Sequence, residues 1–195
     1  MSRRQTSFVL AVLLVGLALV TGCRKGGSFK LRELGFSMRL PPGWKQGEPR
    51  MAGGYRADRN GPFFFESAER DDPSGDVMGF PLEGDSLAEY VDRMLAEHEK
   101  LQALHVGLAK ALDKVTGEPV SEELRQAQSR VISKRPCTVG GLEAIEVVTE
   151  APRSTLMLYL RRGNQVVIVT FGAERQEFSK YEPLFRQAAA TIRIR

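Results

Sequence analysis

Two apolar stretches near the C-terminus decide the fold: Leu156-Met157-Leu158-Tyr159-Leu160 and Val166-Val167-Ile168-Val169-Thr170-Phe171. The segment that joins them contains Gly163-Asn164, a pair typical of a tight β-hairpin turn. Because both stretches are almost continuously hydrophobic, we expect the two strands to be central in a sheet that is covered on both faces.

Other segments upstream of this hairpin have the composition of strands. Phe63-Phe64-Phe65 begins one of them, and three consecutive rings place aromatic groups on both faces, so we expect this strand to be central as well. Gly140-Gly141 is expected to turn the chain between two further strands. The additional strands are predicted at residues 36–40, 55–58, 63–69, 129–133 and 142–150.

The longest predicted helix begins at Ser86. Ser86 and Glu89 have the spacing of a capping box, and Gly117 is the expected end of the helix. An apolar stripe at three- and four-residue spacing predicts that this helix lies on the sheet. The stripe consists of Leu87, Tyr90, Val91, Met94, Leu95, His98 and Leu101.

A second helix is expected after Gly172. Ser179 and Glu182 are candidate capping residues, and Pro183 is expected near the first turn, where proline is tolerated. The apolar face predicted for this helix consists of Phe178, Tyr181, Leu184, Phe185, Ala188, Ala189 and Ile192.

Asp71, Asp72 and Asp76 form the one acidic cluster that suggests a metal site. The spacing of a calcium-binding loop is absent, and Pro73-Ser74-Gly75 is ordinary turn chemistry, so we expect a solvated loop that continues to Gly84. His98 and His105 are the only histidines and lie two helical turns apart, too far to share one metal ion. The sequence therefore assigns no catalytic, metal-binding or cofactor-binding residue.

Cys137 and Trp44 are expected to have structural roles. Cys137 has no histidine near it in the sequence, so we interpret it as a buried, inert thiol beside the Gly140-Gly141 turn rather than a nucleophile. Trp44 follows the Pro41-Pro42-Gly43 turn and is expected to cover one edge of the core, with ligand stacking as the alternative.

The charge balance argues against nucleic acid as a partner. The formal net charge is +4, and Arg3 and Arg4 contribute two of these positive charges from the N-terminal leader described next. Such a small imbalance does not provide the basic surface that phosphate backbones require. The length after the leader fits a single domain, predicted at residues 29–195.

The N-terminus has the pattern of a secretory signal. Arg3 and Arg4 precede an uncharged apolar segment, 8–20, which is too short to span a membrane. Its end, Val20-Thr21-Gly22-Cys23, resembles the lipobox of bacterial lipoproteins. The resemblance implies that residues 1–22 are cleaved and that Cys23 carries a diacylglycerol. A plain signal peptide, or a short buried helix, is the alternative.

Residues 23–28 form the predicted tether. Five residues after Cys23 reach at most about 18 Å, which would hold the domain almost on the membrane. Arg24 stands where an acidic residue would favour retention in the inner membrane of proteobacteria. We therefore expect a lipid-anchored envelope protein, at the outer membrane and facing the periplasm.

The order of elements resembles the PsbP-like superfamily. The resemblance depends on residues 35–44, the long helix, the Gly140-Gly141-Leu142 turn, the hairpin and the pattern from Phe178 to Phe185. It implies an α+β fold, with a curved antiparallel sheet of about six strands sandwiched by helices. This group includes the extrinsic photosystem II protein, a Ran-binding import factor and many bacterial lipoproteins. The segment from Gln102 to Gln128 departs from the pattern.

The resemblance supplies no catalytic residues, and its characterised members act as binding and assembly factors. The expected function is therefore that of a non-catalytic module, not an enzyme, that binds an unknown envelope protein. One alternative is a carrier of a small apolar or lipid ligand between the sheet and the long helix, suggested by Trp44 and Phe63-Phe64-Phe65. A metal-dependent hydrolase using Asp71, Asp72, Asp76 and His98 is the other.

Overall fold

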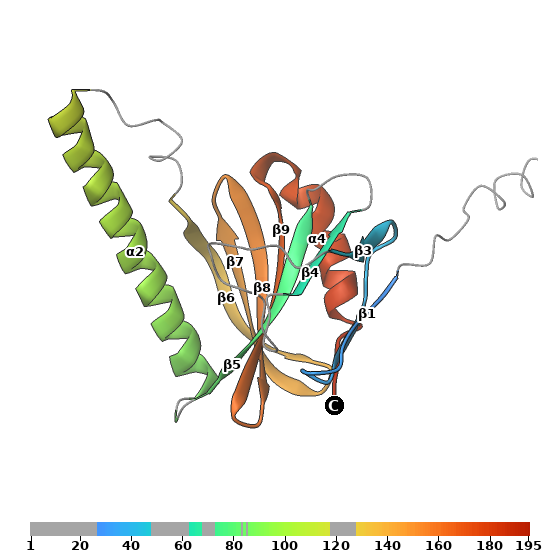
Figure 1. Ribbon diagram of the computed structural model, residues 1–195. Coiled ribbons are helices and arrows are strands. Elements are labelled where there is room, and N and C mark those ends of the chain that lie inside the picture. The colour runs from blue at the N-terminus through green and yellow to red at the C-terminus, as the bar shows by residue number, and fades with distance from the viewer. Residues whose placement is uncertain (1–26, 48–62, 68–72, 83, 85, 118–127) are drawn as a thin grey trace, which may run out of the picture.

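The computed structural model describes residues 27–47, 63–67, 73–82, 84, 86–117 and 128–195. Its main feature is a seven-stranded antiparallel sheet of order β3-β4-β5-β9-β8-β7-β6, accompanied by a three-stranded sheet of order β1-β2-β10 (Figure 1). The strands are β1 (Ser28–Leu31), β2 (Phe36–Arg39), β3 (Trp44–Gln46), β4 (Phe63–Ser67), β5 (Ser74–Pro81), β6 (Arg130–Val139), β7 (Leu142–Glu150), β8 (Arg153–Arg162), β9 (Gln165–Glu174) and β10 (Arg193–Ile194). The helices are α2 (Leu87–Thr116) and α4 (Arg175–Ala189).

The predicted hairpin lies in the middle of the large sheet. Strands β8 and β9 pair from Arg153–Glu174 to Arg162–Gln165, and the turn uses Gly163 at a positive φ of 56°. Side chains on both faces of β9 are buried, because helices cover the two sides. The prediction of two central, doubly covered strands is therefore confirmed.

Each face of the large sheet has its own hydrophobic core. On one face, α4 and the three-stranded sheet pack over residues such as Phe65, Leu158 and Phe171. On the other face, the first turns of α2 pack over Ile145, Tyr159 and Ile168. The α+β sandwich implied by the sequence is confirmed, with seven strands in the main sheet instead of about six.

The first half of the sheet differs from the prediction. Residues 74–81 are not a solvated loop, because they form β5, which pairs with both β4 and β9. The strand of phenylalanines is second from the edge, since only the short β3 lies outside it; Phe65 is buried and Phe64 only half-buried. The predicted strand at 55–58 lies outside the described residues.

Helix α4 begins earlier than expected. It starts at Arg175, with Glu174 as its N-cap residue and no side-chain capping bond, so Ser179 and Glu182 are not caps. Pro183 therefore lies inside the helix rather than in its first turn. The predicted apolar face is nevertheless correct, because Phe178, Phe185, Ala188 and Ala189 are buried against the sheet.

Helix α2 has the predicted ends but not the predicted packing. The Ser86–Glu89 capping box is formed, and Gly117 ends the helix in the left-handed conformation at φ 69°. However, the buried residues of this 30-residue helix are only Leu87, Tyr90 and Val91. Figure 1 shows the rest of α2 leaving the sheet as a projecting arm, so the expectation that the whole helix lies on the sheet is wrong.

Candidate functional site

The projecting part of α2 carries five of the eight large hydrophobic side chains that are exposed among the described residues. We call them the leucine row: Leu101, Leu104, Leu108, Leu112 and Val115. The leucines are 53–57 % exposed, and Val115 is 85 % exposed. Burying a leucine completely is worth about 1.5–3 kcal/mol, so each side chain leaves roughly 1 kcal/mol of hydrophobic stabilisation unused. Contiguous apolar surface of this kind marks an interaction site more often than a solvated helix.

Polar contacts fix the point where α2 leaves the sheet. We assign the Gln102 amide so that its oxygen accepts from the Ser129 N–H at 2.9 Å and from the Ser129 hydroxyl at 2.6 Å. His98 Nε2 lies 2.8 Å from Ser129 Oγ. One turn and a half earlier along α2, Lys134 of β6 forms an ion pair with Asp92. These contacts join the middle of α2 to the start of β6, and thereby orient the leucine row.

The contact between His98 and Ser129 pairs a base with a hydroxyl, a pattern that sequence spacing did not reveal because the two residues are far apart in the chain. A nucleophilic serine needs its base oriented through the second ring nitrogen, and it needs donors for an oxyanion. The contacts made by His98 to Ser129 and Gln102 all use Nε2, and Gln102 competes for the same hydroxyl. We therefore interpret this group as a structural link.

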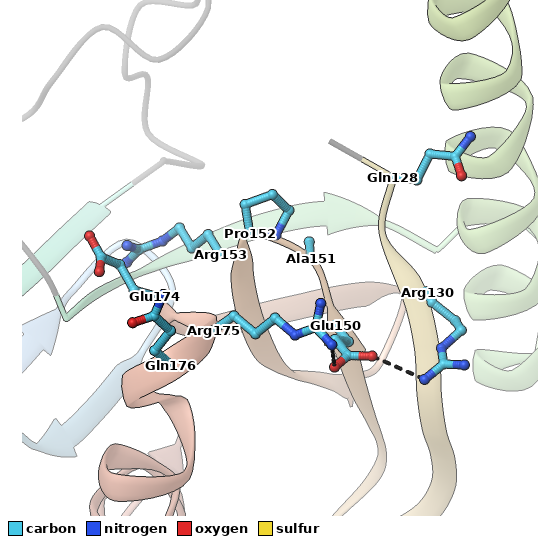
Figure 2. A pocket seen from close by; sticks show the side chains of 9 residues that line it. All are labelled: Gln128, Arg130, Glu150, Ala151, Pro152, Arg153, Glu174, Arg175 and Gln176. Carbon is cyan, nitrogen blue, oxygen red and sulfur yellow. Dashed lines mark hydrogen bonds and ion pairs between the residues drawn. The ribbon is translucent and has the colours of Figure 1, made fainter. Parts of the chain in front are cut away.

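A hollow of about 800 Å³ opens at the end of the sheet beside the start of β6 (Figure 2). Glu150 lies between Arg130 at 3.0 Å and Arg175 at 2.6 Å. Arg153 donates to the Ser74 hydroxyl at 2.8 Å and to the Gly172 carbonyl at 2.9 Å. The nine lining residues are Gln128, Arg130, Glu150, Ala151, Pro152, Arg153, Glu174, Arg175 and Gln176. Among these described lining residues there is no serine, cysteine or histidine, and the hollow offers mainly charged contacts.

The acidic residues suspected of metal binding are not assembled into a site in the described chain. Asp76 lies on β5 opposite Thr170, and its Oδ1 is buried without a hydrogen-bond partner. Burial raises the pKa of Asp76 to about 6, against the opposing effects of the Thr170 hydrogen bond and the charge of Arg153. Among the described residues no three histidine, cysteine or acidic side chains gather around a common point. Asp71 and Asp72 lie outside the described residues.

The remaining candidates have structural surroundings. Cys137 is half-buried and packs against the larger core; burial and the negative charge of Glu146 raise the pKa of its thiol, which disfavours the reactive thiolate. Trp44 is 7 % exposed and contacts the rings of Phe65 and Phe185, as expected for a residue that covers the core. His105 is exposed on the arm. Cys23 lies outside the described residues, and its lipidation stays a prediction.

Comparisons with known proteins bear on the fold. The cyanobacterial PsbP of Synechocystis sp. PCC 6803 superposes with a TM-score of 0.56 at 11 % identity, over 90 % of this chain and 95 % of that one. The chain has the PsbP-like fold. No family model matches the sequence, and no curated protein matches it either.

Two further solved structures are similar to the chain at lower TM-scores. The Ran-binding protein Mog1p of Saccharomyces cerevisiae matches with a TM-score of 0.49 at 10 % identity, over 88 % of this chain and 96 % of that one. LpqN, involved in cell envelope biogenesis of Mycobacterium tuberculosis, matches with a TM-score of 0.47 at 9 % identity, over 86 % and 84 %. At these identities a PsbP-like fold carries no assignment of function.

Part of the candidate surface escaped the sequence analysis. Leu104, Leu108, Leu112 and Val115 continue the helical spacing of the buried stripe, and nothing in that spacing separates a covered turn from an uncovered one. The one available signal was their position in the segment from Gln102 to Gln128, which departs from the PsbP-like pattern. The structure places these residues on the arm, through Thr116.

Proposed function

We propose that the protein is a lipid-anchored, non-catalytic accessory protein of the cell envelope, and that it binds a protein partner through the leucine row of α2. The observation that carries this proposal is the leucine row itself: five aliphatic side chains, each more than half exposed, on a helix that leaves its own sheet. A helix of this length gains little stability from propensity alone, and covering its apolar face is the usual source of stability.

The anchor is supported by the sequence. Arg3 and Arg4, the apolar segment and Val20-Thr21-Gly22-Cys23 match a lipoprotein signal, and the short tether would hold the domain close to the membrane. In the described residues no helix is long and apolar enough to cross a membrane. We place the acyl groups on Cys23 and the domain at the outer membrane, facing the periplasm.

The absence of an enzymatic role is part of the proposal. The hollow is lined by arginine–glutamate pairs, the Ser129 hydroxyl is bonded to Gln102, and the raised pKa of Cys137 disfavours a thiolate. A ligand carrier gains no support from the aromatic residues that suggested it, because Trp44 and Phe65 are buried against other rings on the α4 side of the sheet. Those rings fill the core.

A crosslinking experiment in intact cells tests the protein partner. A photoreactive amino acid is placed at Leu108, and in a matched variant at Glu99, which lies exposed on the polar side of the same helix. We expect a discrete crosslinked species from position 108 and not from position 99. Equal or absent crosslinking at the two positions would contradict the proposal.

The anchor has its own test. The intact mass of the membrane-extracted protein is compared with that of Cys23→Ala. We expect the native form to lack residues 1–22 and to carry acyl chains, and the variant to carry none. A cleaved but unmodified, freely soluble native protein would remove the anchor from the proposal.

A further inference from the structure

Four members of the leucine row have the spacing of a coiled-coil seam. Together with Ala111, Leu101, Leu104, Leu108 and Val115 follow one another at alternating three- and four-residue steps, the a and d positions of a heptad repeat. All five are exposed, and Leu112 lies beside them. The preceding d position holds Glu97, so the seam begins where the sheet contacts of α2 end.

The row faces past the sheet of its own domain. At about 100° per residue, its centre is rotated by roughly 70° around the helix axis from the centre of the residues that contact the sheet. The sheet-contacting residues are Leu87, Tyr90, Val91, Met94 and Leu95. A partner helix along the row would therefore be offset from the side of α2 that packs on the described sheet.

The flanks of the seam select the charge of the partner. In coiled coils the e and g positions determine which helices pair. Here these positions are His98, Lys100, His105, Gly107, Leu112 and Lys114, and the only permanent charges among them are the two lysines. If a second copy of α2 packed antiparallel, with a positions facing d positions, Lys100 would face Lys114 of that copy and the two charges would repel. Acidic residues on a different helix would instead form ion pairs with both lysines.

Gly107 gives a separate indication of close approach. A glycine in the middle of a helix costs stability, and no contact among the described residues requires it here, because a Cβ at this position would meet none of them within 4 Å. Gly107 lies on the same flank as Lys100 and Lys114. The missing side chain lets another backbone come close on the side where the lysines lie.

We propose that the arm binds one amphipathic α-helix of another protein, with aliphatic residues along its seam and aspartate or glutamate along its flanks. This inference rests on the proposed function and names the chemistry of the partner. The two helices would form a short two-stranded coiled coil over residues 101–115, about 22 Å long.

Two designed peptides test the inference. Both contain three heptads with leucine at every a and d position; one has glutamate and the other lysine at every e and g position. Each is titrated into the full acylated chain in phosphatidylcholine nanodiscs, with binding followed by fluorescence anisotropy. We expect the acidic peptide to bind at least about fivefold tighter, because each lysine exchanges a repulsive for an attractive contact.

Variants of exposed residues identify the site without disturbing the fold. Leu108→Glu should abolish binding, Lys100→Glu with Lys114→Glu should reverse the preference between the peptides, and Gly107→Leu should weaken binding of the acidic peptide by about tenfold. Glu99→Gln, on the opposite side of α2, is the control and should leave binding unchanged. Circular dichroism verifies that α2 stays helical in each variant.

Several results would overturn the inference. It fails if the peptides bind equally or not at all, or if the charge reversal has no effect. It also fails if the chain alone forms a stoichiometric dimer that Leu108→Glu dissociates, because the arm would then bind a second copy. It fails likewise if the arm binds anionic vesicles and Leu108→Glu abolishes this binding, because the arm would then bind lipid. If position 108 crosslinks in cells but the acidic and basic peptides bind equally, the proposal of a protein partner is retained. Only the inference that this partner is an acidic helix is then rejected.

Discussion

The buried carboxyl of Asp76 gives the sharpest quantitative prediction. Its Oδ1 has no hydrogen-bond partner among the described residues, and burial raises its pKa to about 6 from the ordinary value of 3.8. The hydrogen bond with Thr170 and the charge of Arg153 lower this pKa, but they do not offset the burial. The folded protein therefore favours the neutral acid, and ionised Asp76 destabilises it.

The sign and size of the effect follow from proton linkage. Below pH 4 the carboxyl is neutral in both states, and above pH 6 it is ionised in both, so stability is lost as the pH rises from about 4 to 6. A shift of about two pKa units corresponds to about 3 kcal/mol. Asp76→Asn removes this pH dependence, and because the amide also lacks one partner, we expect a gain of about 2 kcal/mol at pH 8 and almost none at pH 4.

Urea unfolding at pH 4, 6 and 8 measures the difference, with the free energy of unfolding extrapolated to water. Asp92→Asn is the control, because Asp92 is exposed and forms an ion pair with Lys134; its effect should stay below about 1 kcal/mol at every pH. If Asp76→Asn destabilises the protein at pH 8, or gains equally at pH 4 and pH 8, the assignment of a buried carboxylate with a raised pKa is refuted.

Three further substitutions test the strand pairing, an ion-pair group and the helix cap. Gly75→Ala would place a Cβ 2.1 Å from the carbonyl oxygen of Thr170, and should cost about 3 kcal/mol or more in urea unfolding; a loss below 1 kcal/mol would contradict the tight pairing of β5 and β9. Burial would raise the pKa of Glu146, but hydrogen bonds from two arginines lower it, so its stabilisation is present above pH 4.5 and lost on acidification. Glu146→Gln should therefore cost about 2 kcal/mol at pH 7 and less as the pH falls, and equal losses at pH 7 and pH 3 would oppose this origin. Ser86→Ala removes half of the capping box with Glu89 and should cost about 1 kcal/mol, measured as a lower Tm; an unchanged Tm would show that the box contributes nothing to stability.

The sequence predicted those elements correctly whose local pattern agrees with their surroundings in the fold. The β8–β9 hairpin was recognisable because continuous hydrophobicity over two strands has one stable placement, the middle of a covered sheet. The ends of α2 were recognisable because capping depends on the chain around Ser86 and Gly117 alone.

The errors arose where tertiary contacts override a local preference. Pro73-Ser74-Gly75 has the composition of a turn. However, Gly75 lies in β5, where the ring of Phe65 and the backbone oxygen of Thr170 leave no space for a side chain. Pro183 is tolerated inside α4 because neighbouring residues such as Phe185 bury a face of the helix against the sheet, and this burial offsets the lost backbone hydrogen bond.

The leucine row could not be separated from the core by periodicity, and this failure is informative about function. Leu87 and Leu108 have the same three- and four-residue spacing to their apolar neighbours, but only the first turns of α2 are buried against the sheet. A helix whose apolar residues served its own core alone could end near Leu95, where those contacts end. Instead α2 continues to Thr116 with aliphatic side chains at heptad spacing, lysines on the flanks and a glycine that its own fold does not use. The aliphatic side chains of this continuation pack on no core of the described chain, so their sequence is better explained by what binds the arm than by what the arm supports.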